Sequence, residues 1–233
     1  MLVVDASTPH CVVALGRLGA GVDADLLVDE QDDDGRQASA ELHLRARGLF
    51  ERAQIGPQAL AHLACGRGPG TFTGTRVAVA LCKGLAVATG LPIVAVSTLA
   101  AVAASIEHVG EVLAVLDARR DEVYAAAFTL HGGRVTPRGF ERCAAIEEAL
   151  AAAPGHHVVG PGVAAYAGRI DPGVARTATT GPSARGLWRA AVCAYEAHGP
   201  GDAASLEATY LRESYAELGV NVAKRAMFRS PFV

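Results

Sequence analysis

The stretch from Gly66 to Arg76 (Gly-Arg-Gly-Pro-Gly-Thr-Phe-Thr-Gly-Thr-Arg) has the composition of a loop that could hold a phosphate group. An apolar, strand-like run precedes it, and a long Ala/Val/Leu segment without proline follows it. This order predicts a strand, a tight glycine turn and a helix, whose first N–H groups would form an anion site. Thr73 or Thr75 is expected to cap the helix by accepting a hydrogen bond from a free backbone N–H.

Two nucleotide-binding templates fail on this stretch. A P-loop ends in Gly-Lys-Ser/Thr, whereas Lys83 lies inside the predicted helix. A dinucleotide fingerprint needs Gly or Ala where Thr73 stands, and an acidic residue about 20 positions on, where the chain is uncharged. Two explanations stay open, a close strand–helix turn and a role toward an anion or a partner. The structural glycines of this turn would be Gly66, Gly68, Gly70 and Gly74.

Polar residues also gather at two strand ends. Asp5, Ser7 and Thr8 follow the first apolar strand, and Arg119, Arg120, Asp121 and Glu122 occupy a tight turn between two later strands. A phosphate contact and a purely structural role are both open for the first group. A charged hairpin and a ligand contact are both open for the second.

Composition limits the classes of protein. Hydrophobic residues make up 51% and aromatic residues 5%, so a sizeable core must consist of Ala, Val and Leu. A net charge of −3 argues against binding of nucleic acid by electrostatic attraction. The five cysteines show no C-x-x-C pair; those in apolar surroundings, Cys11, Cys65, Cys82 and Cys193, are interpreted as buried thiols in a reducing compartment. The N-terminus has neither a basic region nor a long apolar run, so we expect a cytoplasmic protein without membrane insertion.

Apolar periodicity places the elements that must position these residues. Strands are expected at 2–7, 11–17, 25–30 and 92–96, and helices at 39–53, 76–90 and from Ser97 to Ser105. On the first helix, Leu42, Ala46, Leu49 and Phe50 fall on one face. The second helix is apolar nearly all round, which predicts that it is covered on more than one side. An acidic loop is interpreted as solvated; it holds Asp29, Glu30, Asp32, Asp33 and Asp34.

The same order of strands and helices then repeats in the second half of the chain. Val112 to Asp117, with Ala118, repeats the first strand, 123–128 the second, and 134–140 the third. A helix at 144–152, a strand at 156–159 and a glycine turn at 160–162 follow. The chain is therefore predicted to be an α/β protein with a two-lobed, duplicated ribonuclease-H-like fold of the actin and sugar kinase type. We place the lobes at 1–105 and 106–233, with the capped helix 183–198 returning to the first and a loose or partner-bound tail after Arg212.

Three stretches resemble one family closely. They are Asp5-Ala-Ser-Thr8, the glycine turn with Lys83-Gly-Leu-Ala86, and Asp117-Ala-Arg-Arg-Asp-Glu-Val-Tyr124. Tyr210-Leu-Arg212 adds to the likeness. Over essentially its whole length, the chain is similar to the TsaB (YeaZ-like) proteins of bacterial tRNA threonylcarbamoyladenosine synthesis.

The resemblance implies a non-catalytic subunit that binds and activates a catalytic paralogue, TsaD, together with a small ATPase, TsaE. The product would be N6-threonylcarbamoyladenosine beside the anticodon of tRNAs that read codons beginning with A, and tRNA would be met only through the complex. A homodimer is expected when TsaD is absent. The alternative is a small-molecule phosphotransferase of the same superfamily, in which nucleotide binds between the halves.

The spacing of the histidines argues against a catalytic metal site. A catalytic relative would hold metal with histidines at i and i+4 of the first helix, but His43 stands alone between Ser39 and Arg47. We therefore expect no metal, no cofactor of its own and no peptidase activity. Ala6 also replaces the glycine usual in the first phosphate turn. Asp5, Ser7, Thr8, Arg119 and Arg120 remain candidate contacts to nucleotide or TsaE.

The family docks TsaD through the first two helices, here 39–53 and 76–90. Small residues of the second helix would let a partner approach closely. We expect charged substitutions at exposed apolar positions of these helices, such as Phe50→Glu or Leu81→Glu, to abolish the association. The interface would comprise Leu42, His43, Ala46, Leu49, Phe50, Val77, Ala80, Leu81, Gly84 and Ala88.

Overall fold

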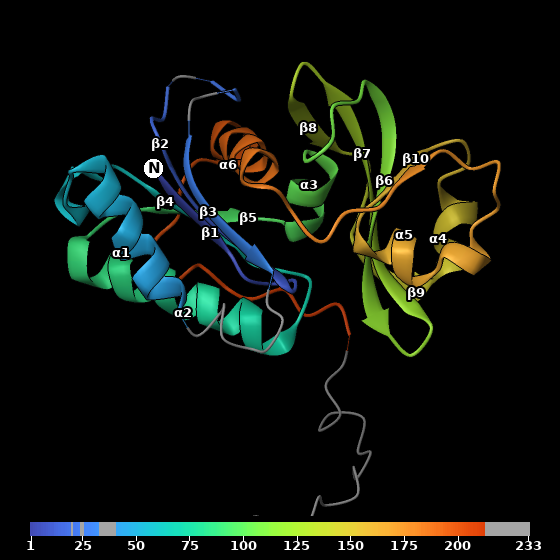
Figure 1. Ribbon diagram of the computed structural model, residues 1–233, viewed down its shortest axis with the longest axis horizontal. Helices are drawn as coiled ribbons and strands as arrows, with labels where there is room; N and C mark the ends of the chain where they lie inside the picture. Colours follow the sequence, from blue (N-terminus) through green and yellow to red (C-terminus); the bar gives the residue numbers. More distant parts are fainter. Residues whose placement is uncertain (20, 24–25, 33–40, 213–233) are drawn as a thin grey trace, which may run out of the picture.

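A computed structural model describes residues 1–19, 21–23, 26–32 and 41–212. Two sheets organise it (Figure 1). The first sheet, in lobe 1, has the order β3-β2-β1-β4-β5, in which β2 runs antiparallel to both of its neighbours and the other pairings are parallel. Its strands are β1 (Leu2–Asp5), β2 (His10–Gly16), β3 (Leu26–Asp32), β4 (Leu63–Gly66) and β5 (Ile93–Val96).

The second sheet, in lobe 2, repeats this order as β8-β7-β6-β10-β11, and the extra strand β9 also pairs with β7. The duplicated ribonuclease-H-like fold is thereby confirmed. The predicted strand 134–140 is wrong in one respect, because the chain leaves β7 after Pro137 and returns to it as β9. The strands are β6 (Gly110–Arg119), β7 (Glu122–His131), β8 (Arg134–Pro137), β9 (Arg142–Ala145), β10 (His157–Val159) and β11 (Arg176–Thr177).

Helices fill three layers around the two sheets (Figure 1). The outer face of lobe 1 carries α1 (Leu42–Ala53) and α2 (Phe72–Thr89), and a short 3₁₀ turn, η1 (Pro57–Ala59), precedes β4. The middle layer holds α3 (Thr98–Ala103) and α6 (Ala184–His198). The outer face of lobe 2 carries α4 (Ile146–Ala152), α5 (Pro161–Ala165) and the 3₁₀ turn η2 (Ala167–Arg169).

The middle layer forms one core shared by both lobes. Apolar side chains from β1, β5, β6, β7, α3 and α6 belong to a single buried cluster. At its centre, Trp188 is fully buried and its indole N–H donates to the carbonyl of Gly21 at 3.0 Å. Helix α6, although late in the sequence, thus packs on the sheet of lobe 1.

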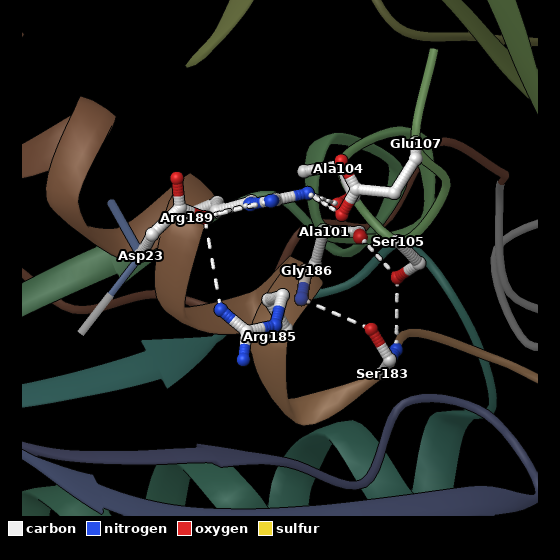
Figure 2. A network of polar contacts seen from close by, with 9 residues as sticks. All are labelled: Asp23, Ala101, Ala104, Ser105, Glu107, Ser183, Arg185, Gly186 and Arg189. Atoms are coloured by element: carbon white, nitrogen blue, oxygen red, sulfur yellow. Dashed lines mark hydrogen bonds and ion pairs between the residues drawn. The ribbon is translucent and has the colours of Figure 1, made fainter. Parts of the chain in front are cut away.

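A polar network fixes α6 in this position (Figure 2). The guanidinium of Arg189, 5% exposed, donates to Asp23 at 2.7 Å and pairs with Glu107 at 2.8 Å. The bond from Arg189 also lowers the pKa of Asp23. At the start of α6, the Ser183 hydroxyl accepts from the N–H of Gly186 at 3.0 Å, which confirms the predicted cap.

Several element bounds differ from the predictions. Helix α2 begins at Phe72 rather than at 76, because Thr71 is its N-cap; Thr73 and Thr75 lie inside the helix and do not cap it. The Thr71 side chain makes no capping hydrogen bond. The acidic loop was predicted to begin too early, because Asp29, Glu30 and Asp32 belong to β3 and pair with β2. Three predicted features lie outside the described residues: Ser39 at the start of the first helix, the acidic residues Asp33 and Asp34, and the tail after Arg212.

Candidate docking groove and interlobe cleft

The inner side of α1 is part of the core of lobe 1. Leu42, Ala46, Leu49 and Phe50 are 1%, 3%, 1% and 8% exposed, and they pack against the sheet. The expectation that Phe50 is an exposed apolar position is therefore wrong. Sequence periodicity identified the apolar face, but the sheet covers it. A charge at Phe50 would perturb the core of the protein before it tested any partner.

Helix α2 leaves part of its apolar surface uncovered. Cys82 and Ala86 face the sheet and are buried, whereas Ala80, Gly84 and Ala88 are exposed and recur every four residues. Val87 beside them is 78% exposed. Val77 and Leu81 are half-buried at the edge of this face. The uncovered face consists of small and apolar residues, so another helix could approach its backbone closely.

A groove separates the two outer helices of lobe 1. Its volume is about 470 Å³, and its walls are mainly apolar. His43 and Arg47, both exposed, stand at its α1 edge. The remaining lining includes Ala46, Phe50, Ile55, Leu81 and Leu85. Of the ten residues expected at an interface, His43, Val77, Ala80, Leu81, Gly84 and Ala88 are at least partly accessible.

The glycine turn lies directly against the end of β1. A Cβ on Gly66 would lie 1.9 Å from a carboxylate oxygen of Asp5, and one on Gly74 would lie 1.8 Å from the carbonyl oxygen of Ala6. The N–H of Thr71 donates to the carbonyl of Ser7 at 2.6 Å. Because real side chains cannot come so close, these positions require glycine. The turn thus seats α2 on the β1–β2 connection.

Asp5 is enclosed by these contacts. It is 0% exposed, accepts from the Ser7 N–H at 2.6 Å and from the Thr98 hydroxyl at 2.7 Å. Burial raises the pKa of its carboxyl group, against the lowering effect of those hydrogen bonds. The described structure therefore gives Asp5 a role in joining β1 to α3. Its expected contact with a ligand is wrong for this conformation, since no face of it is accessible.

One cleft between the lobes is lined by four of the predicted contact residues, Ser7, Thr8, Arg119 and Arg120. Its volume is about 920 Å³. The first two residues come from the β1–β2 connection and the other two from the β6–β7 hairpin, which faces it. The tertiary structure thus brings together residues that are more than 100 positions apart in the chain. Sequence reasoning missed other lining residues, among them Phe72, Arg76, Tyr124, Tyr210 and Arg212.

The β6–β7 hairpin has an uncommon backbone. Arg119, Arg120 and Asp121 have φ values of 64°, 54° and 61°, the left-handed region that residues with a Cβ seldom occupy. The N–H of Arg119 donates to Asp117 at 2.8 Å. The Tyr166 hydroxyl donates to the same carboxylate at 3.1 Å. Burial, together with that hydrogen bond, raises the pKa of Tyr166 to about 12.

The described residues form neither a metal-ligand cluster nor a membrane-spanning helix. No group of three or more His, Cys, Asp or Glu side chains in this part of the chain is arranged to hold a metal ion. None of the helices within residues 41–212 combines the length and apolarity that crossing a bilayer requires. The described cysteines are all free, but Cys193, expected to be buried, is half-buried.

The fold and the cleft define a two-lobed protein of the ribonuclease-H-like class. Residues 35–174 match the family described as "TsaD: tRNA N6-adenosine threonylcarbamoyltransferase". YeaZ from Pseudomonas aeruginosa aligns with a TM-score of 0.78 and 31% identity, over 90% of this chain and 98% of that one. A second Pseudomonas aeruginosa structure, described as similar to peptidase YEAZ, gives a TM-score of 0.79 and 32% identity. The chain therefore belongs to the TsaB/YeaZ-like proteins of this family.

Curated relatives share shorter stretches. The TsaB protein of Haemophilus influenzae is 32% identical over 127 residues, which are 53% of this chain and 51% of that protein. TsaB of Escherichia coli is 45% identical over 69 residues, 28% of this chain and 30% of that protein. The chain thus aligns with about half, or less, of the length of these curated relatives. Both are described as tRNA threonylcarbamoyladenosine biosynthesis proteins.

Proposed function

We propose that this chain takes part in forming N6-threonylcarbamoyladenosine in tRNA, as a non-catalytic subunit that binds the TsaD paralogue through α1 and α2. The observation that carries the proposal is the uncovered apolar face of α2 beside the groove. An exposed apolar surface of this kind marks a protein interaction site. Family membership supplies the process, and the names of the curated relatives point to the same modification.

The geometry of α2 suits a helical partner. One row of this helix has only small side chains, those of Ala80, Gly84 and Ala88. Val87 and the half-buried Leu81 flank it. The matching helices of a related subunit could lie across α1 and α2 and bury this face, giving a four-helix contact. A second copy of the chain would use the same face, which makes a homodimer the expected state without TsaD. TsaE would join the complex, and tRNA would be met through it; the protein would act in the cytoplasm.

Reconstitution of the modification tests the proposal. TsaD, TsaE, the carbamoyl-adenylate-forming enzyme and unmodified tRNA are combined with and without this chain, and the modified nucleoside is measured by mass spectrometry. We expect product only when the chain is present, and none from the chain with tRNA alone. Equal yield without the chain would contradict the proposal. A Leu81→Glu variant is expected to fail to restore product, while circular dichroism shows that it is folded.

A phosphotransferase is the second candidate, and the interlobe cleft favours it. Arg76, Arg119, Arg120 and Arg212 line the cleft, against one carboxylate, Asp117. Such a cleft has the charge for a phosphorylated ligand. Asp5, however, is enclosed and cannot act as a base there. Tight binding of ATP to the isolated chain, with phosphate transfer to a small hydroxyl compound, would establish this candidate in place of the first.

A further inference from the structure

The chain after α6 crosses from one lobe to the other. Gly201 pairs with Ile93 at the edge of β5, with both N–H groups donating to the opposite carbonyl at 2.8 Å. Leu206 is 2% exposed and belongs to the core beneath α2. The N–H of Thr209 then donates to the carbonyl of Arg67 at 2.7 Å. We call residues 201–212 the C-terminal strap.

The strap passes close to the glycine turn. A Cβ on Gly68 would lie 3.2 Å from the carbonyl oxygen of Thr209, and Gly68 has a φ of 92°. Any other residue at this position would be strained and would also press on the strap. Gly68 therefore differs from Gly66 and Gly74. Those two admit the end of β1, whereas Gly68 admits the strap.

Tyr210 fixes the strap to the first turn of α2. Its ring lies 5.6 Å from the ring of Phe72, centroid to centroid. Its hydroxyl oxygen accepts from Nε of Arg76 at 2.9 Å. The guanidinium of Arg76 lies 3.5 Å from the centroid of the Phe72 ring. The three side chains thus form a stack in which a cation contacts an aromatic face.

Arg212 reaches the other lobe. Its Nη1 donates to the carbonyl of Ala118 at 2.6 Å, and its Nε lies 3.7 Å from Oε2 of Glu122. The Arg212 side chain is 20% exposed, so water screens these contacts only in part. Ala118 and Glu122 are the two residues that flank the left-handed turn. One guanidinium therefore bridges both ends of the turn.

The turn that Arg212 bridges is strained. Arg119, Arg120 and Asp121 all have positive φ, and a backbone of this kind persists only where its surroundings hold it. Tyr166 supports it from within lobe 2, where its one hydroxyl proton is shared between Asp117 and the carbonyl of Glu122, whose oxygen lies 2.9 Å from the hydroxyl oxygen. Arg212 supports it from a segment that is itself anchored on lobe 1.

We propose that the C-terminal strap is a latch that joins the first turn of α2 in lobe 1 to the strained β6–β7 hairpin in lobe 2. With Tyr210 and Arg212 seated, the hairpin keeps its left-handed conformation and the cleft keeps its lining. When either side chain is released, the hairpin relaxes. The latch also connects helix α2 to the cleft. It does not depend on the proposed function, because every contact lies within the chain.

Amide hydrogen exchange of the full-length protein tests the latch. Arg212→Ala is expected to speed exchange in the peptide spanning 116–124 by roughly tenfold or more, because it removes a hydrogen bond from a charged donor. The decisive variant is Tyr210→Ala, which changes only the lobe 1 end. If the strap is a latch, this variant also speeds exchange in the 116–124 peptide across the cleft.

Two control variants match these changes. Arg176→Ala removes another arginine that donates to backbone carbonyls, those of Ile170 and Asp171, and Val87→Ala trims an exposed side chain of α2 away from the strap. Both should leave the 116–124 peptide unchanged, and peptides from α4 should keep their protection in every variant. The latch is overturned if Tyr210→Ala leaves the hairpin at the wild-type rate, whether or not Arg212→Ala changes it.

Discussion

The two lobes share one strand order, yet their outer helices differ in length and in the surface they expose. In lobe 1, α1 and α2 have 12 and 18 residues; in lobe 2, α4 and α5 have 7 and 5. At about 1.5 Å per residue, α2 extends far beyond what either helix of lobe 2 can reach. Both pairs bury an apolar cluster against their sheet.

The difference is also visible in exposed apolar side chains. Among the described residues, the large exposed ones on the outer face of lobe 1 are Leu44, Ile55, Phe72 and Val87, whereas α4 and α5 carry none. A short helix is sufficient to cover a sheet. Helix α2 buries side chains along its length as far as Ala86, and its opposite side leaves Val87 and Ala88 uncovered. This uncovered side is where the proposed partner would bind.

The largest effect on stability is expected from a substitution in the core that the two lobes share. Trp188→Ala should lower the free energy of unfolding by about 3–5 kcal/mol, because a fully buried indole is removed from the middle layer. Urea denaturation followed by circular dichroism would show one cooperative transition at lower urea. Two separated transitions, or a loss below about 1 kcal/mol, would mean that the lobes behave as independent domains.

A smaller effect, on partner binding, is expected from matched substitutions on the outer faces of the two lobes. Ala80→Glu on α2 and Ala151→Glu on α4 place the same charge on exposed alanines of the two lobes. We expect Ala80→Glu to weaken binding to TsaD, and self-association, by tenfold or more, since it puts an unpaired charge in an apolar contact. Isothermal titration and sedimentation velocity measure these quantities. Equal effects of both changes would remove the distinction between the faces.

The smallest effect is expected on how the stability of the protein depends on pH. Burial, and to a lesser degree His108, lowers the pKa of His157 in lobe 2, and burial also lowers that of His62 in lobe 1. The unfolded chain therefore binds protons first, so stability is complete above about pH 6.5 and falls as pH drops below it. His157→Gln and His62→Gln should each reduce the stability lost between pH 7.5 and 5.5, measured by urea denaturation. An unchanged loss would contradict this assignment.

The sequence predicted the elements and their repetition well, because these depend on local pattern. Continuous apolar runs indicated β1 and β6. Ser97 and Ser183 stand at the starts of two predicted helices and cap them, and an N-cap can be predicted because it acts within its own turn. The start of α2 was missed by four residues because the glycines and threonines after Thr71 resemble a turn. The proline and the short break after β8 hid β9.

The candidate site was predicted only in part. Ser7, Thr8, Arg119 and Arg120 were singled out, and they line one cleft, because the duplicated strand order places equivalent hairpins opposite each other. Asp5 and Phe50 were misjudged for one reason. Burial depends on what packs against a residue, and here that is Thr98 on α3 and the sheet of lobe 1.

Local sequence pattern is enough to predict the order of strands and helices, the duplication and the apolar character of α2. These follow from side chains that are close together along the chain, where periodicity and capping act. Three features depend instead on how the elements pack: which side of α2 is uncovered, the packing of α6 on lobe 1, and the contacts by which Tyr210 and Arg212 join the two lobes. Those contacts link residues far apart in sequence, and they exist only once both sheets have formed around their shared core.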